Sequence, residues 1–396
     1  MEILRRLFYE KYAATQTHTI RDFIREIDWS NRLIGIKGSR GVGKTTLLMQ
    51  YIKQHFEPGQ EVLYVSLDHF YFSEHRLYDT ADLFYKKGGK FLALDEVHKY
   101  PGWSVEIKNI YDNMPDLQMV FTGSSLLQLQ TSQADLSRRA VMYRMPGLSL
   151  REFIVFETGI RLPSYTLNDL LRDHIKIAME ISAHVKPLHH FDRYLNYGYY
   201  PFYLENKNTF HLKLSQIIMA VLETDIPQTA RIDPSHVFYL KRLLTIIAKS
   251  VPFKPNLRNL SSRTGISINT LKQYLKLLHE AEIIHSLYFP EQGINSLKKA
   301  EKIYLNNTNL MYALTEQVNK GNLRETFFLN QVSVKHNVYA SKEVDFNVDE
   351  TWLFETGGKS KKHKQIEGLP NAYLVKDDLE IGYGNVIPLW MFGFLY

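Results

Sequence analysis

The sequence contains no cysteine among its 396 residues. This absence excludes disulfide bridges and thiolate metal ligands, and it suits a reducing compartment. Long apolar runs are absent too. Charged residues interrupt residues 1–12, which argues against a signal peptide. The last apolar run, residues 386–396, is far shorter than the ~20 residues that a membrane-spanning helix needs. We therefore expect a cytoplasmic protein without a membrane segment.

The sequence also lacks a large excess of one charge. Its 48 basic and 42 acidic residues give a net charge of +6, and the pI is about 9.0. This balance allows nucleic acid as a partner without requiring it. Apolar residues make up 44% of the chain, and there is no low-complexity tract. A chain of this length and composition predicts roughly two to four globular domains.

A glycine-rich segment is the most informative motif that is present. Two glycines five positions apart, followed by Lys and Thr, stand between an apolar strand pattern (residues 33–36) and a helical pattern (residues 46–56). In this context the backbone N–H groups and the helix N-terminus bind phosphate. We expect Lys44 to reach the β- and γ-phosphates and Thr45 to ligate Mg²⁺. The predicted nucleotide contacts are Gly38, Ser39, Arg40, Gly41, Val42, Gly43, Lys44, Thr45 and Thr46.

An acidic pair follows the second buried strand pattern, residues 91–94. Ligands bind at the carboxyl ends of such strands, so Asp95 is expected to hold Mg²⁺ and Glu96 to deprotonate the attacking water. The pair predicts hydrolysis of the nucleotide. ATP is favoured over GTP, since the chain has no Asn-Lys-x-Asp guanine motif. His98 is predicted to be an ordinary loop residue.

A third strand pattern, residues 117–121, precedes a run of small polar residues. In a doubly wound sheet this strand lies between the other two, so Ser124 would contact the γ-phosphate or the lytic water. A helix N-cap at Ser124 or Ser125 is an equal alternative. Further on, Arg139 is a candidate for neutralising transition-state charge, often on a neighbouring subunit's nucleotide. A solvated surface arginine is the alternative role.

These motifs together resemble those of AAA+ ATPases of a bacterial and archaeal family with a C-terminal restriction-endonuclease-like domain. The resemblance covers nearly the whole chain. It implies an α/β fold in which a P-loop AAA+ parallel sheet and a helical lid precede a winged helix and a nuclease-like α/β domain. The implied domains are the ATPase core (1–150), the lid and connector (151–232), the winged helix (233–290) and the nuclease-like domain (291–396).

Three segments between the motifs carry local predictions. Residues 21–27 are predicted to be a lead-in helix, and residues 167–185 are predicted to be helical. The aromatic-rich segment 191–204 is expected to be a packed corner, with stacking of nucleic-acid bases as the alternative.

A helix-turn-helix pattern lies within residues 237–287, with a first helix through residues 260–264, a turn at Gly265 and Ile266, and a second helix opened by Ser267. A strand at residues 283–287 would begin a wing. If the second helix enters a major groove, the candidate DNA contacts are Asn269, Lys272, Gln273 and Lys276. The alternative is that this element only packs against protein.

Three acids near the C-terminus resemble the metal-binding set of restriction endonucleases (PD-(D/E)XK type): Glu325, Asp345 and Glu355. A three-residue loop at 349–351 would place Asp345 opposite Glu355 in a hairpin. The lysine expected two positions after the second acid is Gly357, and Lys359 is a candidate replacement. We therefore expect a weak or lost nuclease.

The sequence thus predicts an ATPase that uses ATP and Mg²⁺ and moves a module on DNA. The alternative is a nucleotide-controlled switch that binds a protein partner or a further copy of itself and carries a vestigial nuclease-like domain.

Overall fold

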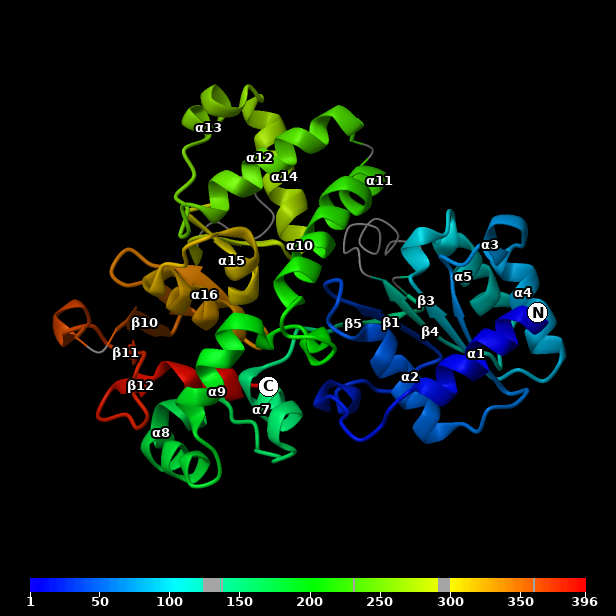
Figure 1. Ribbon diagram of the computed structural model, residues 1–396, viewed down its shortest axis with the longest axis horizontal. Coiled ribbons are helices and arrows are strands. Elements are labelled where there is room, and N and C mark those ends of the chain that lie inside the picture. Colours follow the sequence, from blue (N-terminus) through cyan, green and yellow to red (C-terminus); the bar gives the residue numbers. More distant parts are fainter. Residues whose placement is uncertain (124–135, 137, 231, 291–299, 359) are drawn as a thin grey trace. The chain divides into compact units, whose positions relative to one another are not determined.

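The computed structural model describes residues 1–123, 136, 138–230, 232–290, 300–358 and 360–396 (Figure 1). The chain divides into two compact units, Met1–Gly147 and Leu148–Tyr396. Among the residues described, none of the helices is both long enough and apolar enough to cross a membrane.

The N-terminal unit is a parallel sheet with helices on it. Its strands are β1 (Leu33–Lys37), β2 (Val62–Ser66), β3 (Phe91–Asp95), β4 (Gln118–Gly123) and β5 (Val141–Arg144). The helical elements are α1 (Glu2–Ala14), η1 (Asp22–Arg25), α2 (Lys44–His55), α3 (Tyr71–Glu74), α4 (Leu77–Lys86), η2 (Val97–Lys99) and α5 (Trp103–Asn113). The strand order is β2-β3-β4-β1-β5, and every pairing is parallel.

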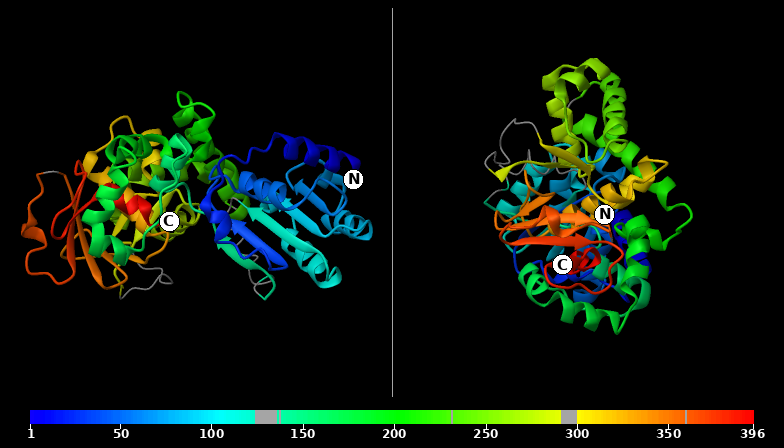
Figure 2. Two further views of the ribbon diagram at one scale, coloured as in Figure 1. Left: turned by 90° about the horizontal axis from the view of Figure 1, so that it is seen from below. Right: turned by 90° about the vertical axis from the view of Figure 1, so that its left-hand side faces the viewer.

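Strands β1 to β4 are almost entirely buried, which is why their sequences are near-continuous apolar runs. The connection from β1 crosses to β2 at the far edge, and the chain then returns through β3 to β4. Because crossovers are right-handed, α2 covers one face of the sheet, while α4 and α5 cover the other. Helix α1 packs against α2 and β2 (Figures 1 and 2). The predicted P-loop sheet is thus confirmed.

The predicted lead-in helix at residues 21–27 is wrong. Only a short 3₁₀ turn, Asp22–Arg25, forms there. The Arg21 guanidinium is buried and donates to the carbonyl oxygens of Val42, Pro146 and Gly147. It therefore links the glycine-rich loop to the segment that follows β5. The long N-terminal helix is α1 instead. It buries Leu4 and Phe8, one turn apart, against the sheet unit.

The C-terminal unit begins with helices and ends with a mixed sheet. Its α-helices are α7 (Leu150–Thr158), α8 (Leu167–Ser182), α9 (Pro187–Arg193), α10 (Phe210–Ala220), α11 (Ile226–Ala230), α12 (Val237–Ala248), α13 (Leu257–Thr264), α14 (Ile268–Glu280), α15 (Thr308–Leu314) and α16 (Lys320–Val332). Shorter helical turns are η3 (Tyr194–Gly198), η4 (Pro201–Leu204), η5 (Val221–Asp225), η6 (Pro234–His236), η8 (His363–Gln365) and η9 (Leu389–Phe394). The strands are β6 (Ile284–Leu287), β7 (Lys302–Leu305), β8 (Val338–Ala340), β9 (Phe346–Val348), β10 (Trp352–Gly357), β11 (Ala372–Lys376) and β12 (Val386–Pro388).

The aromatic segment 191–204 is a packed corner, as predicted. Tyr194, Tyr199 and Tyr203 are buried, and their rings pack among neighbouring aromatic side chains. The Asn309 side chain joins this corner to α15, because it accepts from the Tyr199 amide and donates to the Tyr194 carbonyl. Bases have no access to buried rings, so stacking on nucleic acid is excluded for these tyrosines.

The predicted helix-turn-helix elements are present. Helix α13 ends at Gly265, whose φ of 75° is the left-handed conformation that closes the turn. Helix α14 then begins with the Ser267 side chain accepting from the Thr270 amide. Strand β6 follows and pairs antiparallel with β7. These elements have the order that the sequence pattern predicted.

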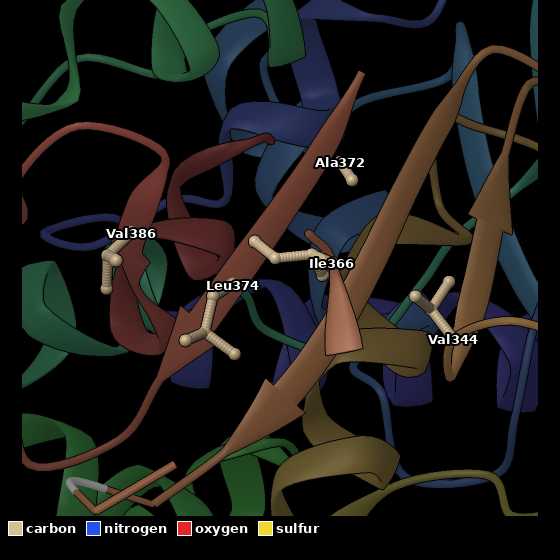
Figure 3. Packing of buried hydrophobic residues seen from close by; sticks show 5 residues of the cluster. All are labelled: Val344, Ile366, Ala372, Leu374 and Val386. Atoms are coloured by element: carbon tan, nitrogen blue, oxygen red, sulfur yellow. The ribbon is translucent and has the colours of Figure 1, made fainter. Parts of the chain in front are cut away.

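The C-terminal sheet has the strand order β12-β11-β10-β9-β8, with parallel pairs at one end and antiparallel pairs at the other. Helix α16 packs against β10. An apolar cluster stabilises the sheet, with side chains from β11, from β12 and from the connections before β9 and before β11 (Figure 3): Val344, Ile366, Ala372, Leu374 and Val386.

Candidate nucleotide site

The glycine-rich loop joins β1 to α2 at the carboxyl end of the sheet. Gly41 and Gly43 have φ values of 91° and 96°, a left-handed conformation that glycine adopts without strain. Gly38 is required for a different reason: a Cβ atom there would lie 2.3 Å from the Met145 carbonyl oxygen. The loop can therefore keep its shape only with glycine at these positions.

Lys44 is the first residue of α2, directly after this loop, and it is only 4% exposed. Its ammonium donates to the carbonyl oxygens of Gly38 (2.8 Å) and Ser39 (2.9 Å). The loop thus folds around a buried positive charge at the N-terminus of α2. Anions are stabilised by such a charge and by the helix dipole, so this is a phosphate-binding arrangement.

Three hydroxyl groups converge on the Asp95 carboxylate at the end of β3. Thr45 Oγ1 and Tyr64 Oη each donate to Asp95 Oδ2 at 2.6 Å, and Thr122 Oγ1 donates to Asp95 Oδ1. Tyr64 and Thr122 come from β2 and β4, the two neighbours of β3 in the sheet. The oxygens of Thr45 and Asp95 are hard donors of the kind that Mg²⁺ prefers, so these residues fit that ion.

Glu96 stands next to this cluster in a left-handed conformation, with φ of 53°. Its amide donates to Thr122 Oγ1 at 3.3 Å, so a single hydroxyl group contacts both acidic residues. Burial raises the pKa of the Glu96 carboxyl, while the nearby positive charges of Lys44 and Arg40 act in the opposite direction. A carboxyl group with a raised pKa is better suited to accept a proton from water.

His98 is not an ordinary loop residue. Its side chain is buried, and Nε2 lies 3.4 Å from Glu96 Oε2. The left-handed turn at Glu96 brings the two side chains together. The prediction failed because the burial of a histidine after a strand depends on this turn, which the residue pattern does not reveal.

Two other predicted site residues have a different outcome. Ser124 lies outside the described residues, as does Ser125. Arg139 forms two hydrogen bonds to the Asp112 carboxylate, from Nε at 2.8 Å and from a terminal nitrogen at 3.0 Å. The role of Arg139 at a nucleotide stays a prediction.

Tyr64 and Thr122 were not among the predicted site residues. The sequence does hold a signal for both. In the parallel register Ser66 lies beside Asp95, so Tyr64, two residues earlier, shares the face of the Asp95 side chain. Thr122 follows Phe121, which pairs with Leu94, so it lies beside Asp95 on the other side.

Of the three C-terminal acids, Glu325 lies on α16, Glu355 lies on β10, and Asp345 directly precedes β9. The predicted three-residue loop is confirmed, since Phe346 pairs with Phe354 and Val348 pairs with Trp352. The Asp345 amide donates to Glu355 Oε2 at 3.1 Å, which places these two acids opposite each other. Among the residues that the structure covers, no group of three or more His, Cys, Asp or Glu is arranged to hold a metal ion.

Each of these acids has neighbours that engage its oxygens. Glu355 pairs with Lys361 at 2.6 Å, and the Thr356 hydroxyl donates to Asp345 at 2.9 Å. The Tyr304 hydroxyl donates to Glu325 at 2.6 Å. Lys359, the predicted replacement for a catalytic lysine, lies outside the described residues. Two lysines of the described residues pair with acids of this set: Lys361 with Glu355, and Lys302, whose Nζ lies 3.7 Å from Asp345 Oδ1.

A pH dependence of stability follows from Glu325. Burial and the nearby Asp345 charge raise its pKa from 4.5 to about 7, and the Glu355 charge acts in the same direction, while Tyr304 and Lys302 oppose it. The folded state therefore binds this proton more tightly than the unfolded state, and the free energy of unfolding falls as the pH rises from about 4.5 to about 7.

A glutamine at position 325 cannot ionise. Glu325→Gln is therefore expected to remove the fall in the free energy of unfolding with pH and to stabilise the protein at pH 8 by on the order of 2 kcal/mol. Urea unfolding at pH 5.5 and pH 8 measures the free energy of unfolding. Glu367→Gln, at an exposed position in the same unit, is the control. An equal pH dependence in wild type and Glu325→Gln would contradict the prediction.

The candidate DNA contacts lie on the outer side of α14. Asn269, Gln273 and Lys276 are exposed, and Lys272 is half-buried. The opposite side of the helix is buried through Leu271, Tyr274, Leu275 and Leu278. The four polar residues are therefore available to a partner.

A parallel sheet of this strand order, a glycine-rich loop after β1 and an acid at the end of β3 together define a P-loop nucleotide-binding domain. Residues 30–154 match the family model described as an AAA domain. Residues 188–321 match the model of a domain of unknown function (DUF8612). The chain therefore contains an AAA-type domain, while the winged-helix and nuclease-like assignments stay predictions.

No curated protein matches the chain. Several solved structures resemble it at low identity. They include the Walker-type ATPase PABY2304 of Pyrococcus abyssi (15% identity, 74% of this chain and 93% of that chain, TM-score 0.43). DnaA from Aquifex aeolicus bound to AMPPCP has 17% identity over 70% of this chain and 89% of that chain, with a TM-score of 0.27. The Hsp104–ADP complex of S. cerevisiae has 15% identity over 69% and 38%, with a TM-score of 0.30.

Proposed function

We propose that this protein binds ATP with Mg²⁺ in its N-terminal unit and hydrolyses it. The observation that carries the proposal is the convergence of Thr45, Tyr64 and Thr122 on Asp95, beside a loop that surrounds the Lys44 ammonium. Phosphate and a hard cation would meet at this place. The match of residues 30–154 to an AAA domain supports the same conclusion.

The chain's own residues then have distinct roles. The loop amides and Lys44 would bind the phosphates, and Thr45 and Asp95 would hold Mg²⁺, which when bound neutralises charge on the phosphates. Glu96 would orient the attacking water and accept its proton. Thr122 would keep both acids in place through its two hydrogen bonds. Ser124 keeps its predicted role near the γ-phosphate.

The output of the cycle is proposed to be movement of the helix-turn-helix, as part of a winged helix, on DNA in the cytoplasm. This rests on the exposed polar side of α14. An interaction between copies of the chain would be needed for Arg139 to reach a neighbouring nucleotide. In that case its two hydrogen bonds to Asp112 must break first.

The DNA proposal predicts a specific effect of Lys276→Glu. Lys276 is exposed and pairs with Glu280 one turn away at 3.7 Å. If it contacts phosphate, the substitution should weaken duplex binding roughly tenfold at low salt and reduce the salt dependence by about one ion. Fluorescence anisotropy with labelled duplex across a salt series measures both quantities.

Lys176→Glu is a matched control for this experiment. Lys176 is equally exposed in the same unit and pairs with Glu180 one turn away at 3.8 Å. Equal weakening by both substitutions would mean that only net charge matters. Measurement of ATP turnover with and without duplex and single-stranded DNA completes the test, because the proposal requires turnover to rise with DNA.

The second candidate function is a nucleotide-controlled switch whose output is contact with protein. It is favoured by the C-terminal acids, whose oxygens are already engaged by Lys361, Thr356 and Tyr304. Such acids act as structural groups, and the nuclease-like domain would be vestigial. Turnover that depends on Glu96 and is indifferent to DNA would select this function.

A further inference from the structure

Helix α1 delivers a lysine to the Asp95 cluster. Lys11 Nζ donates to the Tyr64 hydroxyl at 2.6 Å, and the same hydroxyl donates to Asp95 Oδ2 at 2.6 Å. Lys11 also lies over the Tyr64 ring, with Nζ 4.4 Å from the ring centroid. The N-terminal helix is thus joined to the end of β3 through a single tyrosine.

The donor and acceptor groups of Lys11, Tyr64 and Asp95 determine the direction of both hydrogen bonds. An ammonium group has donors only, so the Tyr64 oxygen must accept from Lys11. The tyrosine has one hydroxyl proton, and it is then directed at Asp95, which accepts. Lys11 therefore sets the orientation of the Tyr64 hydroxyl, and Tyr64 in turn holds one carboxylate oxygen of Asp95.

The hydrogen bond from Tyr64 can determine the orientation of the Asp95 carboxylate. Tyr64 is buried within β2, beside β3. Asp95 Oδ2 accepts from both Tyr64 and Thr45. The oxygen that Tyr64 holds is therefore the one that also meets the proposed Mg²⁺ ligand Thr45.

We propose that Lys11 and Tyr64 are positioning residues that hold the Asp95 carboxylate in the orientation that binds Mg²⁺. Helix α1 would then contribute to the ATP site through Lys11. The proposal rests on the function proposed above. Neither residue contacts nucleotide or metal itself. Replacing them would therefore reduce the gain in nucleotide affinity that Mg²⁺ provides. It would change the nucleotide affinity without the metal less.

The test measures the affinity for a fluorescent ATP analogue in Mg²⁺ and in EDTA, and takes the ratio. Tyr64→Phe keeps the ring under the Lys11 ammonium but removes the hydroxyl, and with it the hydrogen bonds to Lys11 and Asp95. We expect the Mg²⁺-dependent gain in affinity to fall about tenfold, with the affinity in EDTA unchanged. Lys11→Met should give a smaller loss in the same direction. Lys11→Arg should restore the wild-type ratio, because a guanidinium also only donates.

Lys53→Met is the matched control. Lys53 Nζ donates to the carbonyl oxygens of Tyr12 and Thr15 and so holds the end of α1 on α2, without contact to Asp95. If the role of Lys11 were only to dock the helix, Lys53→Met would lower the ratio as much as Lys11→Met. The thermal unfolding midpoint of each variant shows whether it folds. If Tyr64→Phe does not fold, Lys11→Met is the variant that tests the proposal.

The outcomes separate the inference from the function on which it rests. If the wild type shows no gain in affinity from Mg²⁺, the proposed function fails and the inference fails with it. If the wild type shows the gain and neither Tyr64→Phe nor Lys11→Met changes it, only the inference is overturned. An equal effect of Lys53→Met, or no rescue by Lys11→Arg, also overturns it.

Discussion

Glu96→Gln is expected to lower ATP turnover by roughly 10²–10⁴-fold, the usual contribution of a general base, while nucleotide affinity stays close to that of the wild type. Glutamine keeps the size of the side chain and can still receive a hydrogen bond, but it cannot accept a proton from water. The left-handed backbone at Glu96 and the hydrogen bond from its amide N–H to Thr122 Oγ1 do not depend on the carboxylate. Phosphate release and binding of a fluorescent nucleotide measure the two quantities.

The control for this substitution is Glu74→Gln, at an exposed position at the end of α3. It changes the net charge by the same amount in the same unit. Its turnover should equal that of the wild type. A Glu96→Gln variant that hydrolyses ATP at more than about a tenth of the wild-type rate would contradict the assigned role, and His98 would then be the next residue to replace.

The sequence predicts those site residues that directly follow a strand, because the apolar pattern of the strand is visible in the sequence. The loop from Gly38 to Thr45 and the acid at Asp95 each belong to one strand and the residues after it. Parallel strands end at one edge of a sheet, so the two segments had to meet there. The hairpin register in which Asp345 faces Glu355 was predictable for a similar reason, because the alternation of apolar residues favoured a three-residue loop over a two-residue loop.

The parts that could not be predicted depend on how separate elements pack. Lys11 reaches Tyr64, and through it Asp95, only because α1 lies against β2, and nothing in residues 1–12 indicates that neighbour. The apolar spacing of Leu4 and Phe8 does signal a helix, and that signal was missed. Arg21, in contrast, looked like part of a helix, yet its side chain is used to bind three carbonyl groups of distant loops.

Phe328→Ala is expected to destabilise the C-terminal unit by about 3–5 kcal/mol, the usual cost of a large cavity in an aromatic core. Phe328 is fully buried on α16. Its ring centroid lies 5.1 Å from those of Phe346 and Phe354 and 4.8 Å from that of Phe392. Removal of the ring deletes contacts to two strands and to the C-terminal turn at once. Chemical denaturation followed by circular dichroism measures the loss.

The two compact units make this prediction selective. Phe328 belongs to the second unit, so the variant should still bind fluorescent ATP with Mg²⁺ at temperatures where the C-terminal unit has begun to unfold. Phe238→Ala is the matched control, because Phe238 is 63% exposed in the same unit, and this substitution should cost less than about 1 kcal/mol. A loss of similar size in both variants would show that the aromatic cluster around Phe328 does not stabilise the unit. Loss of ATP binding together with the C-terminal unit would show that the nucleotide site needs the second unit to fold.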